Sequence, residues 1–213
     1  MLGRWSRYAP LTGVAFVALI VAGVATSNNT PNSDASGQKV LAFYQAHHSS
    51  QQTGDFLFAL AVVFLVFFTG SLRGYLRRTP AAEALSAVVL AGAVLLGTGL
   101  LIFSGLDFAL SDVPSKLDPA AAQALNLLDN DLFFPVAAGG CIYGIAAGLA
   151  ILRGAALPDW LGWVAIVIGI AAATPAAFPA LIAFAVWTVV VGILVYMRTG
   201  ADATAPLSDP AGA

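Results

Sequence analysis

The chain has 213 residues, of which 59% are hydrophobic and only 9% are charged, with a mean hydropathy of +0.87. A soluble globular domain carries roughly 25% charged residues, so a chain this apolar cannot cover a surface that faces water. The net charge of −2 excludes the strongly basic surface that is typical of nucleic-acid-binding proteins. We therefore expect an integral membrane protein whose partner is the lipid bilayer, and no nucleic acid.

Six apolar stretches predict membrane-spanning helices, each of which needs about 20 apolar residues. We place them at residues 11–27, 56–76, 84–106, 132–152, 160–173 and 178–197. The last two divide one long apolar run, because Pro175 and Pro179 in the sequence TPAAFP lack the amide donors of a continuous helix. Five spans with a re-entrant segment in this run are the alternative. The predicted fold is an all-α, polytopic membrane helix bundle: one six-helix domain over residues 1–199, then a flexible tail over 200–213.

Two longer connections, at residues 28–54 and 107–131, are expected to lie outside the membrane on the same side. In the first, apolar and aromatic residues recur with helical spacing at Val40, Phe43, Tyr44 and His47. This pattern predicts a short amphipathic helix on the membrane surface, with its aromatic side chains facing the lipid. In the second, Asp118 followed by Pro119 is the typical start of a helix that runs toward the fourth span, with a kink expected at Pro135. The two outer helices are expected to cap the bundle.

Basic residues indicate the orientation, because short cytoplasmic loops are enriched in Lys and Arg. With six spans, only Lys39 and Lys116 lie on the outer side. The basic residues of the inner side are Arg4, Arg7, Arg73, Arg77, Arg78, Arg153 and Arg198. We expect a cell (inner) membrane protein with both termini in the cytoplasm and an acidic outer face. The group Arg73, Arg77 and Arg78 is foremost an orientation signal, and contact with anionic lipid headgroups is the alternative. The first span also resembles a secretory signal peptide, although an uncleaved anchor is favoured.

The two histidines, His47 and His48, lie side by side in the first outer segment. Adjacent helical residues point about 100° apart, so the two rarely share one metal ion. A metal site would combine His47 with the carboxylates Asp55, Asp129 and Asp131. The favoured interpretation is that His47 lies at the membrane interface and His48 in water. Neither histidine lies within a span, which argues against a two-histidine haem site, and no cofactor is expected.

Small residues recur at every fourth position in two of the spans, a pattern that lets helix backbones approach closely. They are Gly140, Gly144 and Gly148 in the fourth span, and Ala165, Gly169 and Ala173 in the fifth. Tight packing within one chain is the favoured interpretation, and a homo-oligomer face is the alternative.

The interiors of the predicted spans contain no ionisable residue, and the sequence has no nucleophile–base set or phosphate-binding loop. These features count against a proton-coupled transporter and against an enzyme. The first functional hypothesis is a non-enzymatic accessory or interaction subunit, or a small binding module. The second is a carrier or binder of an apolar or lipid-like molecule, with a pocket near Thr98, Tyr143 and Trp187. The third is an outer-face metal-binding protein that uses His47.

Four segments resemble an uncharacterised family of bacterial multi-pass membrane proteins. They are VLAFYQAHH before the second span, FTGSLRGYLRR at its end, LPDWLGWVAIVIGI at the start of the fifth span and WTVVVGILVYMR in the last. The resemblance covers residues 36–198 and implies a bacterial membrane protein with six spans. It implies no catalytic residue, because the family carries no assigned activity.

Overall fold

The structure is a computed structural model that describes residues 7–77, 79–154 and 157–204, with side chains up to residue 199. Within these ranges the chain forms helices and no strand, which confirms the predicted all-α membrane bundle. The α-helices are α2 (Thr12–Thr26), α3 (Gly37–Leu76), α4 (Pro80–Asp112), α5 (Pro119–Asp131), α6 (Phe133–Gly154), α7 (Asp159–Ala172) and α8 (Ala177–Thr204). Two short 3-10 helices accompany them, η1 (Ala9–Leu11) and η2 (Pro114–Lys116). The helix α8 continues past residue 199, where the tail was expected to begin, and residues 205–213 lie outside the described ranges.

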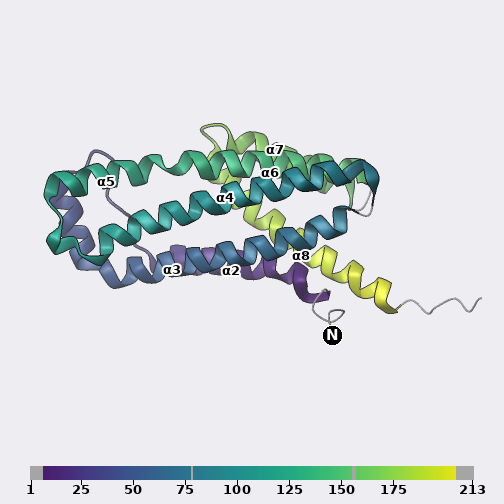
Figure 1. Cartoon of the computed structure of the whole chain (residues 1–213), viewed down its shortest axis with the longest axis horizontal. Coiled ribbons are helices and arrows are strands. Elements are labelled where there is room, and N and C mark those ends of the chain that lie inside the picture. Colours follow the sequence, from purple (N-terminus) through teal and green to yellow (C-terminus); the bar gives the residue numbers. More distant parts are fainter. Residues whose placement is uncertain (1–6, 78, 155–156, 205–213) are drawn as a thin grey trace, which may run out of the picture.

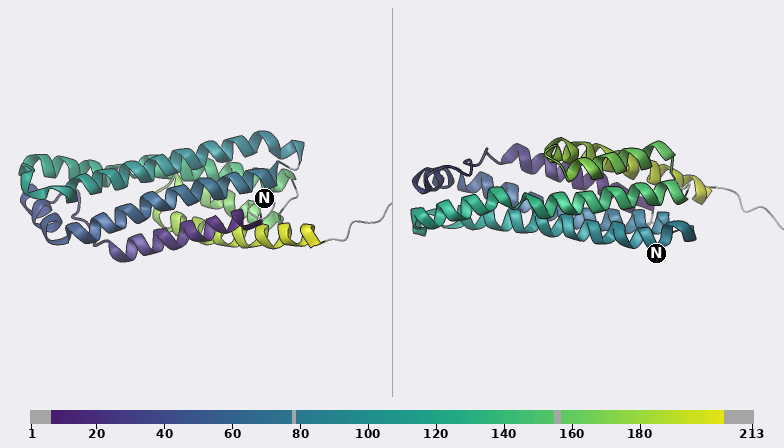
Figure 2. Two further views of the ribbon diagram at one scale, coloured as in Figure 1. Left: turned by 60° about the horizontal axis from the view of Figure 1, so that its bottom comes forward. Right: turned by 90° about the horizontal axis from the view of Figure 1, so that it is seen from above.

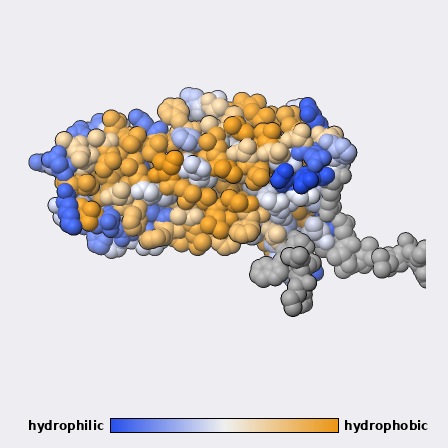
Figure 3. Space-filling model, in the orientation of Figure 1, coloured by the Kyte–Doolittle hydropathy of each residue, from blue (hydrophilic) through white to orange (hydrophobic). Residues whose placement is uncertain are grey.

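Five stretches of the described chain are helical, long and apolar enough to cross a membrane. They are Ala9–Thr26, Gly37–Leu76, Pro80–Asp112, Pro119–Gly154 and Ala177–Thr199. Figure 3 shows hydrophobic side chains over the middle of the visible face and hydrophilic side chains toward its two ends. So large an exposed apolar surface does not suit a soluble monomer. The chain is therefore a helical membrane protein.

The long helices run alternately up and down the long axis of the molecule (Figure 1). The helices α7 and α8 form a hairpin beside them, and its turn at residues 173–176 stops short of the end formed by α5 (Figures 1 and 2). The start of α2 and the end of α8 lie at the same end of the bundle. With 14 residues, α7 is about 21 Å long, which is less than the roughly 30 Å of a hydrocarbon core. Six full crossings therefore remain a prediction.

Helix α3 is about 60 Å long, because each of its 40 residues adds about 1.5 Å. This is about twice the roughly 30 Å of a hydrocarbon core, so about half of α3 is not needed for a crossing. The predicted separate surface helix is wrong: residues 37–55 are the beginning of α3, and Tyr44 is buried within the protein. Its first turns curve across the end of the bundle (Figures 1 and 2). The hydroxyls of Ser50 and Thr53 donate to backbone carbonyls one turn back, which favours bending.

The helix predicted to begin at Asp118 and Pro119 is confirmed as α5. The carboxylate of Asp118 accepts a hydrogen bond of 3.0 Å from the amide of Ala120, and Pro119 occupies the first turn. The expected kink at Pro135 is replaced by a break between α5 and α6, with Pro135 in the first turn of α6. Helix α5 lies against α3 and α4 over a small apolar core of Ala35, Val40, Tyr44, Leu110 and Ala122. We call this end of the molecule, formed by α5 and the small core beneath it, the cap.

Glycines bring α6 and α7 into close contact. A Cβ atom on Gly144 would lie 2.7 Å from the carbonyl oxygen of Ala165 and 2.8 Å from the Cα of Gly169. Gly148 faces α7 in the same way, whereas Ala173 is exposed at the end of that helix. The absence of side chains at these positions is thus what allows the short helix α7 to lie directly on α6.

Candidate functional sites: a buried carboxylate cluster and an apolar groove

Three buried carboxyl groups lie beneath the cap, each on a different helix, and they are close enough to act on one another electrostatically. They belong to Asp55 of α3, Asp107 of α4 and Asp129 of α5, which are 3%, 4% and 2% exposed. All three lie outside the crossings predicted at residues 56–76, 84–106 and 132–152. An ionised carboxylate is costly to bury without a counter-charge, yet no basic side chain in the described ranges forms an ion pair with any of them. We call these three residues the carboxylate cluster.

Asp107 is the central acceptor of the carboxylate cluster. The phenol O–H of Tyr44 donates to its Oδ1, and the Nε2 of Gln51 donates to its Oδ2 over 3.3 Å. The side chain of Asp55 lies within hydrogen-bonding reach of Asp107. Tyr44, Gln51 and Asp55 follow one another at spacings of seven and four residues, which are close to whole turns and place them on one face of α3.

The connection between α2 and α3 closes over this network. The backbone N–H of Asn28 donates to the Oε1 of Gln51 at 2.7 Å. On the other side, the Nδ2 of Asn126 in α5 donates to the carbonyl oxygen of Asn32 at 3.0 Å. These bonds tie the connection to α3 and to α5, and they leave the carboxylate cluster enclosed.

Burial changes the acidity of the cluster. It raises the pKa of Asp55 from 3.8 to about 8, and the carboxyls of Asp107 and Asp129 add to this effect. Burial and the charge of Asp107 raise the pKa of Asp129 to about 7. Burial also raises the pKa of Asp107, although hydrogen bonds from Tyr44 and Asp55 act in the opposite direction. These pKa values allow the cluster to take up and release protons near neutral pH.

The predicted metal ligands are only partly brought together. Asp55 and Asp129 lie near Asp107, but Asp131 is exposed. The Nδ1 of His47 lies 2.9 Å from the backbone carbonyl oxygen one turn earlier. Across the described part of the chain, no three His, Cys, Asp or Glu side chains are arranged to hold a metal ion. The acidic site is therefore centred on Asp107, which the sequence reasoning missed, and not on His47.

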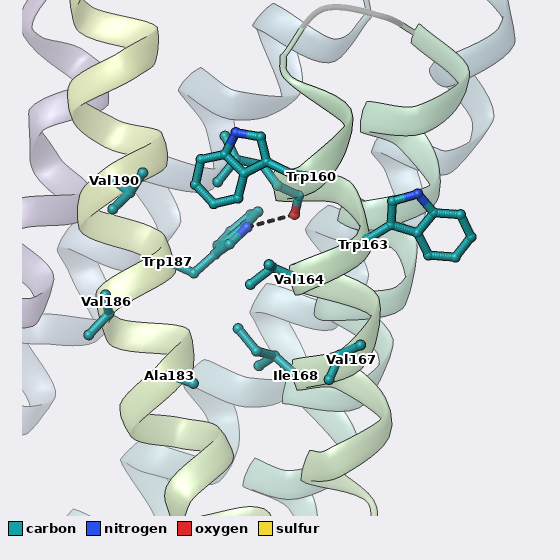
Figure 4. A pocket seen from close by; sticks show the side chains of 10 residues that line it. Trp160, Trp163, Val164, Val167, Ile168, Ala183, Val186, Trp187 and Val190 are labelled. Atoms are coloured by element: carbon teal, nitrogen blue, oxygen red, sulfur yellow. Dashed lines mark hydrogen bonds between the residues drawn. The ribbon is translucent and has the colours of Figure 1, made fainter.

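The second candidate is an apolar groove of about 580 Å³ between α7 and α8 (Figure 4). Its walls are Trp160, Leu161, Trp163, Val164, Val167 and Ile168 of α7, and Ala183, Val186, Trp187 and Val190 of α8. The indole Nε1 of Trp187 donates to the carbonyl oxygen of Leu161 at 3.0 Å, drawn as the dashed line in Figure 4. The groove therefore offers a hydrocarbon-like surface without an ionisable side chain.

Aromatic side chains form the back of the groove. The ring of Trp187 is stacked on that of Phe184, with 6.2 Å between centroids, and Tyr143 of α6 meets both rings edge-on. Of the predicted pocket residues, Trp187 lines the groove and Tyr143 lies behind it, whereas Thr98 is exposed on α4 and is not among the walls. The groove is thus a feature of the α7–α8 hairpin backed by α6.

The described arginines of the predicted inner side lie at the other end of the molecule. Arg77 forms an exposed ion pair with Glu83 at 3.2 Å, and Arg73 is half-buried in the last turn of α3. Arg4 and Arg78 fall outside the described residues. Contact of this group with lipid headgroups stays a prediction.

Comparisons of the chain with protein-family models, with curated proteins and with solved structures found no match. The apolar helices that the sequence resemblance implied are present. The family and the bacterial origin stay predictions.

Proposed function

We propose that this protein is a non-enzymatic membrane module that binds an apolar, lipid-like molecule in the groove between α7 and α8. The observation that carries the proposal is the groove itself, whose volume of about 580 Å³ falls in the range of small-molecule sites. Its walls contain no ionisable side chain, and the indole N–H of Trp187 is already hydrogen-bonded. This surface favours a hydrocarbon chain over a polar or charged ligand.

The rim of the groove supports entry from the bilayer. Trp160, Trp163, Val167 and Val186 are between 55% and 64% exposed, although all are large and apolar. In Figure 4, Trp163 points away from the groove, whereas Trp187 lies between the two helices. A rigid aromatic wall loses little conformational freedom when a ligand binds against it. A chain-like lipid can therefore lie along Trp187 at little entropic cost.

Filling the groove tests this function. Ala183→Phe places a ring between the walls, so we expect lipid occupancy to fall at least about tenfold, or roughly 1.4 kcal/mol. Ala185→Phe is the matched control, because Ala185 is also half-buried on α8 but does not line the groove. Native mass spectrometry of protein extracted in mild detergent measures the bound mass and its occupancy.

Equal lipid occupancy in Ala183→Phe and in the unsubstituted protein would contradict the proposal. A second polypeptide retained in these spectra without any lipid would instead support an accessory or interaction subunit.

We also propose that the protein lies in the cell membrane with both termini in the cytoplasm. The end of the bundle that holds the start of α2 and the end of α8 also carries Arg73, Arg77 and Arg153. The carboxylate cluster lies at the opposite end. Arginines at the end that holds the start of α2 and the end of α8 support cytoplasmic termini by the positive-inside rule.

A further inference from the structure

The carboxylate cluster lies apart from the proposed groove, and its hydrogen bonds require a proton. Ionised carboxylates carry acceptors only, so two of them cannot form a hydrogen bond unless one is protonated. The buried carboxyls of Asp55 and Asp107 lie within hydrogen-bonding reach of each other. Asp107 already accepts from Tyr44 and Gln51, which favour its ionised form. Asp55 is therefore the member of the pair that carries the proton and donates it toward Asp107.

Asp129 adds a third carboxyl from α5. It is 2% exposed, and its Oδ1 has no hydrogen-bond partner. The Oδ2 of Asp55 is likewise buried and without a partner. The cluster is thus short of donors, and each added negative charge must be held in an enclosed space.

The basic groups on the elements around the cluster do not neutralise it. Lys39 and His48 of α3 and Lys116 of η2 are exposed, and His47 is half-buried against its own backbone. None of these four forms an ion pair with a described carboxylate. The titratable groups that act on the Asp55–Asp107 pair are Tyr44 from α3 and Asp129 from α5, and the uncharged Gln51 donates to Asp107. Protons are therefore the cations available to this site.

We propose that the carboxylate cluster is a proton-binding site that holds α5 closed over the outer end of the bundle. Helix α5 has 13 residues and is flanked by η2 and by the break at Leu132, so it can move while α3 and α4 stay intact. When the shared proton and the proton of Asp129 pass to water, three negative charges occupy one buried space. Outward movement of α5 relieves this repulsion by exposing Asp129 to water, and it breaks the hydrogen bond from Asn126 to Asn32.

The pKa shifts of Asp55 and Asp129 have the direction that pH-dependent closure of α5 requires. Burial raises the pKa of Asp129 to about 7 and that of Asp55 to about 8 in the closed form. In the open form both groups return toward the ordinary 3.8, so the closed form binds more protons between these limits. The contribution of these two groups to the stability of the closed form is therefore complete below about pH 4. It is lost as the pH rises through 7 to 8.

Hydrogen exchange over the α5 amides tests the proposal in lipid nanodiscs. Protection at pH 5 and pH 8 is compared after correction for the intrinsic effect of pH on exchange. We expect the protein to lose protection about tenfold or more at pH 8, since one pKa unit corresponds to a tenfold change. Asp129→Asn keeps the shape of the side chain without its charge, so it should remove most of this loss. Asp131→Asn, exposed on the same helix, is the matched control and should behave like the unsubstituted protein.

A second readout follows the proton itself. Infrared spectra at pH 5 should contain the carbonyl band of a protonated carboxyl that weakens at pH 8 and is reduced in Asp55→Asn. Unchanged α5 protection between the two pH values overturns the proposal, as does an Asp129→Asn variant that still opens at pH 8. The absence of a protonated-carboxyl band at pH 5 overturns it as well.

Discussion

Asp55 directly precedes the crossing predicted at residues 56–76 of α3, a position where a carboxylate would ordinarily face water. The cap covers it instead, so that it is 3% exposed and meets Asp107. A carboxyl in this environment is more stable when protonated, and ionisation therefore acts against the fold. At the scale of single residues, the stability of this end of the molecule therefore depends on the protonation of Asp55.

Asp55→Asn should make the stability of the protein less sensitive to pH. The pKa of Asp55 in the folded state is about 8, above its ordinary 3.8. Its contribution to the free energy of unfolding is therefore complete below pH 4 and is lost as the pH approaches 8. An asparagine amide can donate to Asp107 without ionising. We expect the variant to have a higher Tm than the unsubstituted protein at pH 8 and a similar Tm near pH 4.

Thermal unfolding in detergent measures this difference, with Asp112→Asn as the control, because Asp112 is exposed on α4. A variant with a lower Tm than the unsubstituted protein at pH 8 would show that the charge of Asp55 stabilises the fold.

Helix α7 depends on α6 for its position. It is too short to span the hydrocarbon alone, and it lies where glycines allow backbone contact. Between two helices in lipid, close packing takes the place of the hydrophobic effect as the source of association. At the scale of elements, the groove exists because α7 is held against α6 while α8 crosses beside it.

Gly144→Ala should destabilise this contact. Its Cβ would lie 2.7 Å from the carbonyl oxygen of Ala165, so α7 must move away from α6. Overpacking of this kind costs about 1–3 kcal/mol, and we expect a lower Tm together with weaker lipid retention in the groove.

Gly105→Ala is the control on α4, since no atom lies within 4 Å of the added Cβ. It should leave the Tm unchanged or raise it, because alanine favours helix by up to about 1 kcal/mol relative to glycine. Equal Tm values for both variants would contradict the inference that close backbone contact holds α7 against α6.

The whole molecule has chemically different ends. The carboxylate cluster and the cap occupy one end, and the described arginines occupy the other, with an apolar belt between them (Figure 3). Lys and Arg near the ends of spans are retained in the cytoplasm. We therefore predict one orientation in the membrane, with the cap outside.

Reporter fusions check this orientation. Fusions at the two termini should both report the cytoplasm, and an insertion in η2 should report the outer side. Termini on opposite sides would mean five crossings with α7 re-entrant, and an η2 reporter in the cytoplasm would contradict the orientation itself.

Local signals in the sequence were sufficient for the fold class and for α5. Apolar stretches marked the membrane helices, and the pair Asp118–Pro119 marked the start of α5, because capping depends on neighbouring residues alone. The carboxylate cluster was not predicted from the sequence, because it depends on contacts such as that between Tyr44 and Asp107, which are 63 residues apart. One signal was present: the polar residues Gln51 and Asp55 continue the helical face of Tyr44, which indicates that α3 begins long before the membrane. The groove depends on how α7 and α8 cross in space, which the hydrophobic periodicity of each helix does not predict.

The shortness of α7 also constrains how the protein is made. A segment of 14 residues is too brief to leave the translocation channel as an independent span, so α7 must enter the bilayer together with α8 as one unit. The glycine face of α6 precedes both helices in the chain, so it is synthesised before they are. The lipid-facing groove can therefore form only after α8 has been synthesised.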